Sequence, residues 1–82
     1  MKNIKIDGRE YYFQIASDVI RDGIGIELWE ISNKKDIYLA EIFRNDEKKR
    51  VEFTGDVKDL PFRLIEKLIE LFKSEISQEF QE

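Results

Sequence analysis

Residues 23–43 read GIGIELWEISNKKDIYLAEIF, and this stretch decides the fold. Two apolar runs, rich in β-branched and aromatic residues, flank the polar segment 33–36, as is typical of two antiparallel strands joined by a turn. Strand side chains alternate between two faces, yet both runs carry large apolar residues at both parities. The first run has Ile24, Ile26 and Leu28 at one parity and Trp29 and Ile31 at the other; the second has Ile37, Leu39 and Phe43 at one and Tyr38, Ala40 and Ile42 at the other.

Two explanations are open for the change of phase in the first run. Either a β-bulge near Leu28 shifts the face, or both faces of these strands are buried. The two strands are predicted to be central, because only they carry large apolar residues on both faces. On strict alternation, the sheet face opposite the helix would carry Tyr12, Trp29, Ile31, Tyr38 and Ile42.

The segment before this pair predicts a hairpin. Asp7-Gly8 suits a two-residue type I′ turn, in which both central residues have positive φ. For residues 17–23, SDVIRDG, we expect a loop that contains one helical turn, with Val19 and Ile20 pointing inward. Apolar residues alternate on both sides of the Asp7-Gly8 turn, with Ile4 and Ile6 before it and Tyr11, Phe13 and Ile15 after it.

The segment after the pair predicts one more strand and a helix. Residues 50–56, RVEFTGD, place Val51 and Phe53 inward. Asp59 or Leu60 is the expected helix cap, and Pro61 falls in the first turn, where its missing N–H removes no hydrogen bond. The apolar face covers an arc of about 180°, wider than the stripe of an ordinary surface helix. It consists of Phe62, Leu64, Ile65, Leu68, Ile69, Leu71, Phe72, Ile76 and Phe80.

These patterns predict an α+β fold in a single domain spanning residues 1–82. It consists of an antiparallel meander of four to five strands within about residues 2–55, with one C-terminal amphipathic helix, about residues 60–78, packed on one face. One helix covers only one side of a sheet. The apolar residues on the other side therefore predict contact with a second copy of the chain or with another partner.

Composition narrows the classes of function. The 82 residues include no Cys and no His, which excludes thiol nucleophiles, imidazole bases and the usual zinc ligands. Asp18, Asp22 and Gly23 provide too few oxygen ligands for a Ca²⁺ loop. We therefore expect no enzyme, no catalytic residues, no cofactor and no metal. No signal peptide and no run of about 20 apolar residues is seen, so a cytoplasmic protein without a membrane partner is expected.

The function predicted from these features is protein–protein interaction. A net charge of −4 and aromatic residues with polar tips favour an acidic inhibitor or accessory protein that binds a basic partner. One alternative is a homodimer formed through the sheet face opposite the helix. The predicted partner-binding residues are Tyr12, Trp29, Ile31, Tyr38 and Ile42.

A second alternative is a single-stranded nucleic-acid binder that stacks bases on the aromatic sheet face. The charges disfavour nucleic acid as a partner. The basic segments 34–35 and 48–50 fall at opposite ends of the fourth strand, and Glu27, Glu30 and Glu41 lie between them. Nucleic-acid affinity requires local positive potential.

Overall fold

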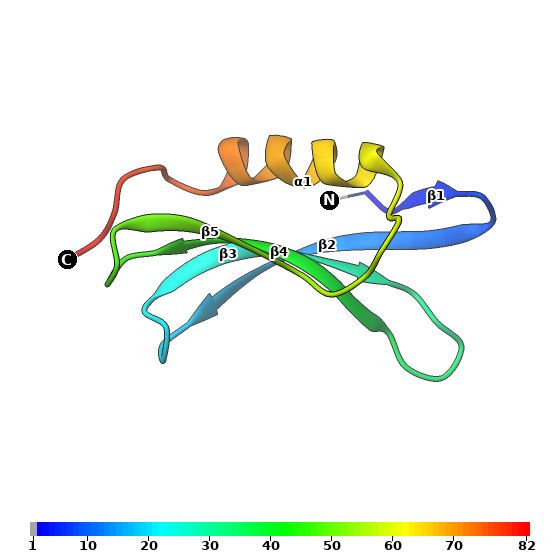
Figure 1. Cartoon of the computed structure of the whole chain (residues 1–82), viewed down its shortest axis with the longest axis horizontal. Helices are drawn as coiled ribbons and strands as arrows, with labels where there is room; N and C mark the ends of the chain where they lie inside the picture. Colours follow the sequence, from blue (N-terminus) through cyan, green and yellow to red (C-terminus); the bar gives the residue numbers. More distant parts are fainter. Residues whose placement is uncertain (1) are drawn as a thin grey trace.

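The computed structural model describes residues 2–82 and has two layers, a twisted antiparallel sheet and a helix across one of its faces (Figure 1). The strands are hydrogen-bonded in sequence order, so the predicted α+β meander with one C-terminal helix is confirmed, with five strands. The elements are β1 (Ile4–Ile6), β2 (Arg9–Asp18), β3 (Gly23–Glu30), β4 (Ile37–Asn45), β5 (Arg50–Gly55) and α1 (Phe62–Glu75).

The hydrophobic core lies between α1 and the three middle strands. From the helix side come Leu64, Leu68, Leu71, Phe72 and the residue that follows the helix, Ile76. From the sheet come Tyr11, Phe13, Ile26, Leu28, Leu39, Ala40 and Ile42. Burial of each large side chain stabilises the fold by about 1.5–3 kcal/mol before chain entropy is counted. This layer fixes the position of α1 over β3 and β4.

The helix is shorter than predicted at both ends. Pro61 is the N-cap, with an extended ψ of 126°, so neither Asp59 nor Leu60 caps the helix. Asp59 has a φ of 59°, in the left-handed region, and the residue before a proline disfavours helical angles. At the other end, Ile76 turns to an extended conformation and is buried in the core.

Only part of the wide apolar arc of α1 faces the sheet. The leucine half of the arc faces the sheet, and the other half is left partly open. Phe62 is 69% exposed, Ile69 is exposed and Ile65 is only half-buried. The arc is therefore divided between the core and a surface beside β5.

The prediction for residues 17–23 was wrong. Ser17 and Asp18 belong to β2, and Val19 and Ile20 lie at the tip of the β2–β3 hairpin with 95% of their surface exposed. The carboxylate of Asp18 organises this tip, because its Oδ1 accepts hydrogen bonds from the N–H groups of Ile20 (3.0 Å) and Arg21 (3.1 Å). This tight turn directs both apolar side chains into solvent instead of toward the core.

A β-bulge lies in the centre of the sheet, where β3 and β4 pair. The register shifts between Leu28 and Trp29, as one explanation predicted, but the extra residue is Leu39 of β4. Trp29 pairs with Tyr38, and Leu28 pairs with Ala40. Beyond the bulge the faces of β4 are exchanged. Ile42 therefore lies in the core under the helix, and its predicted place on the opposite face was wrong.

Candidate interaction surfaces

The sheet face opposite α1, called the open face below, carries an aromatic cluster from the three central strands. Tyr12, Trp29 and Tyr38 lie side by side because the register pairs Tyr12 with Trp29 and Trp29 with Tyr38. The rings of Tyr12 and Trp29 are stacked, with centroids 6.2 Å apart and planes 7° apart. Trp29 and Tyr38 meet edge to face, at 5.6 Å and 75°. The structure thus brings together three of the five predicted partner-binding residues.

Acidic groups hold these rings in place. The indole N–H of Trp29 donates to Glu27 Oε1 at 3.0 Å, and the hydroxyl of Tyr12 donates to Asp36 Oδ2 at 3.1 Å. Burial, together with the nearby carboxylates of Glu41 and Glu27, raises the pKa of Tyr38 to about 12. The tyrosine hydroxyls therefore stay protonated at neutral pH, and the cluster presents half-buried rings beside carboxylates.

The two predicted isoleucines lie in different places. Ile31 follows the last residue of β3, and its N–H donates to the carbonyl of Glu10 at 2.8 Å. Continued register places it at the edge of the aromatic cluster on the open face, partly exposed. Ile42 lies on the helix side, as described above. The alternation of apolar residues could not predict that Ile31 and Ile42 lie on different faces, because the bulge at Leu39 has no strong sequence signature.

A second cluster covers the other half of the open face. Phe43 is fully buried although no helix covers it. The guanidinium of Arg21 lies 3.9 Å from the centroid of its ring. Arg21 also donates to both carboxylate oxygens of Glu41 (2.9 and 3.0 Å) and to Asp18 (2.7 Å). The ring fits because Gly23 has no side chain: a Cβ there would lie 2.7 Å from Phe43 Cζ.

Sequence reasoning missed Arg21 and Phe43 as a unit. Sequence reasoning counted Glu41 only as one of the acidic residues between the two basic segments. It is buried and pairs with Arg21, which reaches it from the hairpin turn. The signal in the sequence is the carboxylate of Glu41 within an apolar run, since a buried charge requires a partner.

The charges of the open face are unevenly balanced. Glu27 lies directly opposite Glu41 in the β3–β4 register. Glu41 is paired with Arg21, whereas Glu27 forms no ion pair within residues 2–82 and accepts a hydrogen bond only from Trp29. Asp36, which accepts from the Tyr12 hydroxyl, also has no ion pair within these residues, so two carboxylates without a cation border the aromatic cluster. The β2–β3 and β3–β4 turns both bend away from α1, so the open face is concave (Figure 1). Tyr12, Trp29 and Tyr38 are each partly exposed on it.

An apolar groove, called the β5 groove below, lies on the helix side between α1 and β5. Its volume is about 360 Å³, and it is lined by Ile42, Val51, Glu52, Phe53, Ile65 and Ile69. Val51 and Phe53 do face the helix side, as predicted, but they remain 49% and 58% exposed. They are not covered because α1 packs over β3 and β4 and not over β5.

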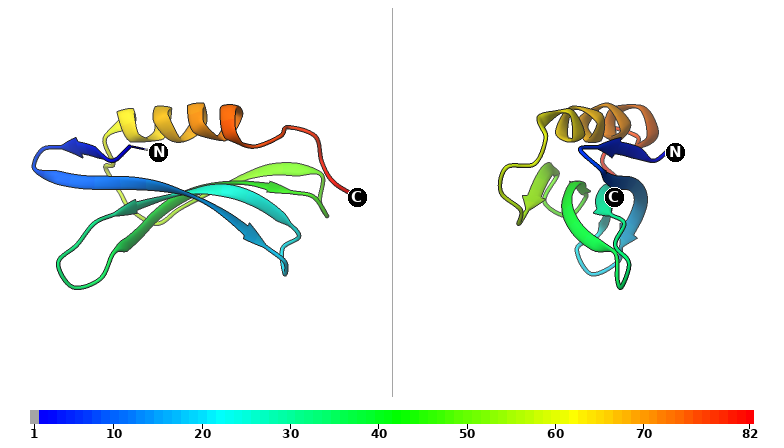
Figure 2. Two further views of the ribbon diagram at one scale, coloured as in Figure 1. Left: turned by 180° about the vertical axis from the view of Figure 1, so that it is seen from behind. Right: turned by 90° about the vertical axis from the view of Figure 1, so that its right-hand side faces the viewer.

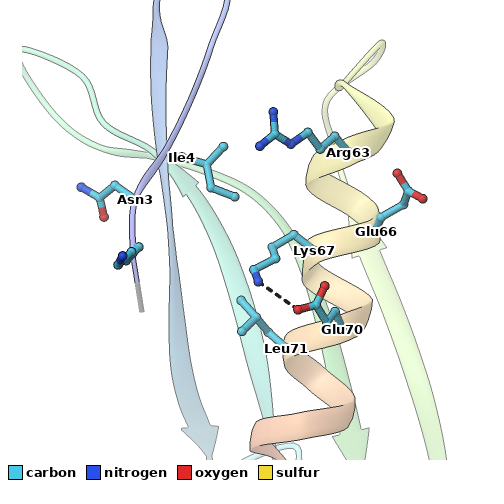
Figure 3. A pocket seen from close by; sticks show the side chains of 8 residues that line it. Asn3, Ile4, Arg63, Glu66, Lys67, Glu70 and Leu71 are labelled. Atoms are coloured by element: carbon cyan, nitrogen blue, oxygen red, sulfur yellow. Dashed lines mark hydrogen bonds and ion pairs between the residues drawn. The ribbon is translucent and has the colours of Figure 1, made fainter.

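A larger, polar cleft of about 680 Å³ separates the start of the chain from the other flank of α1. Figure 3 shows Asn3 and Ile4 on one side and Arg63, Glu66, Lys67 and Glu70 on the helix. Lys67 pairs with Glu70 at 3.0 Å along the helix surface. Charges of both signs alternate here, which is typical of a solvated helix face.

Residues 2–82 contain no group of three or more side chains placed to hold a metal ion. Over the same residues, α1 is too short and too polar to cross a membrane. Comparison with family models, with curated proteins and with solved structures finds no match to this chain.

Proposed function

We propose that this protein is a non-catalytic interaction module that binds a basic protein partner through the open face. One observation carries the proposal: the aromatic cluster is bordered by the carboxylate of Glu27, which has no cationic partner within residues 2–82. An arginine or lysine of a partner would pair with Glu27 and lie against the ring of Trp29. Such contacts combine a charge-assisted hydrogen bond with a cation–π interaction.

The geometry of the cluster supports this proposal. The hydrogen bonds to Asp36 and Glu27 hold the Tyr12 and Trp29 side chains before any partner arrives. Little side-chain entropy is then lost on binding. A net charge of −4 adds long-range attraction for a basic partner and a rapid encounter rate. An inhibitory or accessory role follows from this chemistry, because the protein would cover a basic surface.

Two other proposals compete with it. A homodimer packed open face to open face would bring the unpaired Glu27 of each copy into a shared low-dielectric interface, which is unfavourable. A single-stranded nucleic acid would stack on Trp29, and the exposed Lys34 and Lys35 lie in the adjoining turn. Its phosphates would also meet Glu27 and Asp36, so a basic protein fits this surface better.

Trp29 is the only tryptophan, so its fluorescence reports on the open face. We expect a hexa-arginine peptide at low salt to change this fluorescence in a saturable way. Glu27→Gln should weaken the binding about tenfold, by removing one charge-assisted contact. The control Glu66→Gln removes the same charge from an exposed position on α1 and should have little effect.

Hexa-glutamate and an oligothymidylate should leave the fluorescence unchanged. If the oligothymidylate binds and hexa-arginine does not, the nucleic-acid alternative replaces this proposal. If Glu27→Gln and Glu66→Gln weaken hexa-arginine binding equally, the attraction is general and the open face is not the site.

A further inference from the structure

We propose that the β5 groove and the free edge of β5 form a self-association surface, at which a second copy of this chain pairs antiparallel to β5. This surface lies on the helix side of the sheet and is separate from the open face. Two features meet there: an unpaired strand edge and the partly open half of the apolar arc of α1. The end-on view in Figure 2 shows β1 and β5 at opposite sides of the sheet beneath the helix.

The first feature is the strand edge. The described part of the chain pairs β5 only with β4, so one side of β5 presents backbone N–H and C=O groups without strand partners. Proteins usually protect such edges with short strands, prolines, bulges or inward charges. β1 follows this rule, with three residues and Lys5 at its centre. β5 is longer, its six residues include no proline, and its register with β4 is regular. Its two charged residues, Arg50 and Glu52, form an ion pair with each other at 2.8 Å, so β5 is less protected than β1.

The second feature is apolar area. A phenylalanine side chain buries about 150–250 Å² when it is covered, so the open part of Phe53 amounts to roughly 90–150 Å². Val51, Ile65 and Ile69 extend this patch along the groove. A standard interface buries about 800 Å² on each partner, with an apolar centre and a polar rim. Together with the backbone of β5, the patch has the size of such a centre.

When β5 pairs antiparallel with β5 of a second copy, complementary residues lie opposite each other. A two-fold axis perpendicular to the sheet keeps both helices on one side and joins the two grooves. With the axis at Phe53, this residue lies opposite Phe53 of the second copy. Val51 then lies opposite Gly55, and Arg50 lies opposite Asp56 of the other copy. The two Phe53 rings therefore meet, and opposite charges meet at both ends of the strand pair. Val51 meets Gly55 and the Phe53 ring that lies beside this glycine.

Neighbouring registers are less favourable. An axis at Glu52 places two Glu52 carboxylates directly opposite each other, and an axis at Thr54 places Glu52 opposite Asp56. Like charges at opposed positions are destabilising. An axis at Val51 pairs only the first half of β5. Within residues 2–82, Glu52 is the one charged residue that lines the β5 groove, so the groove has little net charge with which to select a charged partner. The complementary charges of two β5 strands therefore favour a second copy of the chain.

Light scattering tests the association, and single cysteines test the register. The unchanged protein should have twice its chain mass of 9.8 kDa at micromolar concentration. Phe53→Asp should raise the dimer dissociation constant at least about thirtyfold, as expected for an interface hot spot. Val19→Asp adds the same charge at an exposed apolar position on the hairpin tip and should leave the dimer intact.

The chain has no cysteine, so Phe53→Cys and Val51→Cys each create a single thiol. A disulfide needs Cα atoms about 4.4–6.8 Å apart, which the two-fold axis at Phe53 provides. Two copies of residue 51 would lie about 14 Å apart along the strands. Loss of the Phe53 ring also weakens the dimer, so oxidation is carried out at a protein concentration above the dissociation constant of each variant. Mild oxidation should then cross-link Phe53→Cys and not Val51→Cys.

A monomer mass across the micromolar range would overturn the proposal, as would equal cross-linking of the two cysteine variants. If Phe53→Asp fails to fold, the cysteine pair still decides the question. The outcome is independent of the hexa-arginine titration, because Trp29 lies on the opposite face of the sheet from the β5 groove.

Discussion

Arg44 and Asp46 form a buried, bidentate ion pair that ties the segment after α1 to the sheet. Arg44 Nε and Nη2 donate to the two carboxylate oxygens of Asp46 at 2.8 and 3.1 Å. Arg44 Nη1 donates to the carbonyl of Ser77 at 2.7 Å, and the N–H of Gln81 donates to Asp46 at 3.2 Å. The last residues of the chain therefore lie against the end of β4 through one charged pair (Figure 1).

This pair predicts how stability depends on pH. The Arg44 guanidinium holds the pKa of the Asp46 carboxyl below its usual value. A carboxyl whose pKa is lower in the folded state stabilises the fold above its unfolded pKa of about 3.9, and this contribution is lost as pH falls through the folded value. The pKa values of Asp18, beside Arg21, and of Glu52, beside Asn45 and Arg50, are also lowered. Each of these three carboxyl groups therefore stabilises the fold near neutral pH, and each contribution is lost in acid.

Urea unfolding monitored between about pH 6 and pH 2 should show a loss of stability in acid. Asp46→Asn should be less stable near pH 6 and should show a smaller loss on acidification. Glu75→Gln, at the exposed end of α1, serves as the control and should keep the full acid dependence. An Asp46→Asn variant with the same acid dependence as the unchanged protein would contradict this account.

Arg21 gives a second prediction, because it neutralises Glu41 and covers Phe43. Arg21→Met should destabilise the fold by about 1–3 kcal/mol, since buried Glu41 loses both hydrogen bonds. The Arg21 side chain is 38% exposed, which keeps the loss below that of a fully buried pair. Arg21→Lys should recover only part of it, because an ammonium group cannot donate in parallel to both oxygens of Glu41.

The double variant Arg21→Met/Glu41→Leu separates charge from packing. Replacing a buried ion pair by apolar residues is often neutral, so the double variant should be more stable than Arg21→Met alone in urea unfolding. If it is less stable than Arg21→Met, the cost arises from lost cover over Phe43 and not from the unpaired carboxylate.

Much of the fold could be predicted because the local signals agree with it. Asp7-Gly8 adopts the predicted positive φ values of 52° and 80° at the first turn, and the β2–β3 register follows strict alternation throughout. The surfaces were harder to predict. The extra residue at Leu39 exchanges the faces of β4, and no side chain in the sequence marks it. The place of a β-bulge such as this one depends more on the twist of the whole sheet than on the local sequence.

The apolar surplus of the sequence was expected to lie on the sheet face opposite the helix. On that face Arg21 covers Phe43, whereas the open apolar area at Val51 and Phe53 is on the helix side. Alternation predicts which face of a strand a residue occupies. It does not predict how far a single helix reaches across that face, and α1 stops short of β5.

Because only part of the apolar arc of α1 is buried, alanine substitutions along the helix should lower the free energy of unfolding by unequal amounts. Leu68 is fully buried between α1 and the sheet, and Leu68→Ala should lower the free energy of unfolding by about 2–5 kcal/mol. Phe72→Ala should cost about 3–5 kcal/mol for the same reason. Ile65 is half-buried beside the β5 groove, so Ile65→Ala should cost only about 1 kcal/mol in the monomer.

Urea unfolding at low protein concentration measures these free energies without a contribution from association. Raising the protein concentration should then penalise Ile65→Ala further, because its side chain lines the β5 groove, and should leave the loss in Leu68→Ala unchanged. Equal losses for Ile65→Ala and Leu68→Ala at low concentration would mean that α1 is rotated from the orientation described. A loss in Ile65→Ala that does not depend on concentration would place the groove outside any self-association surface.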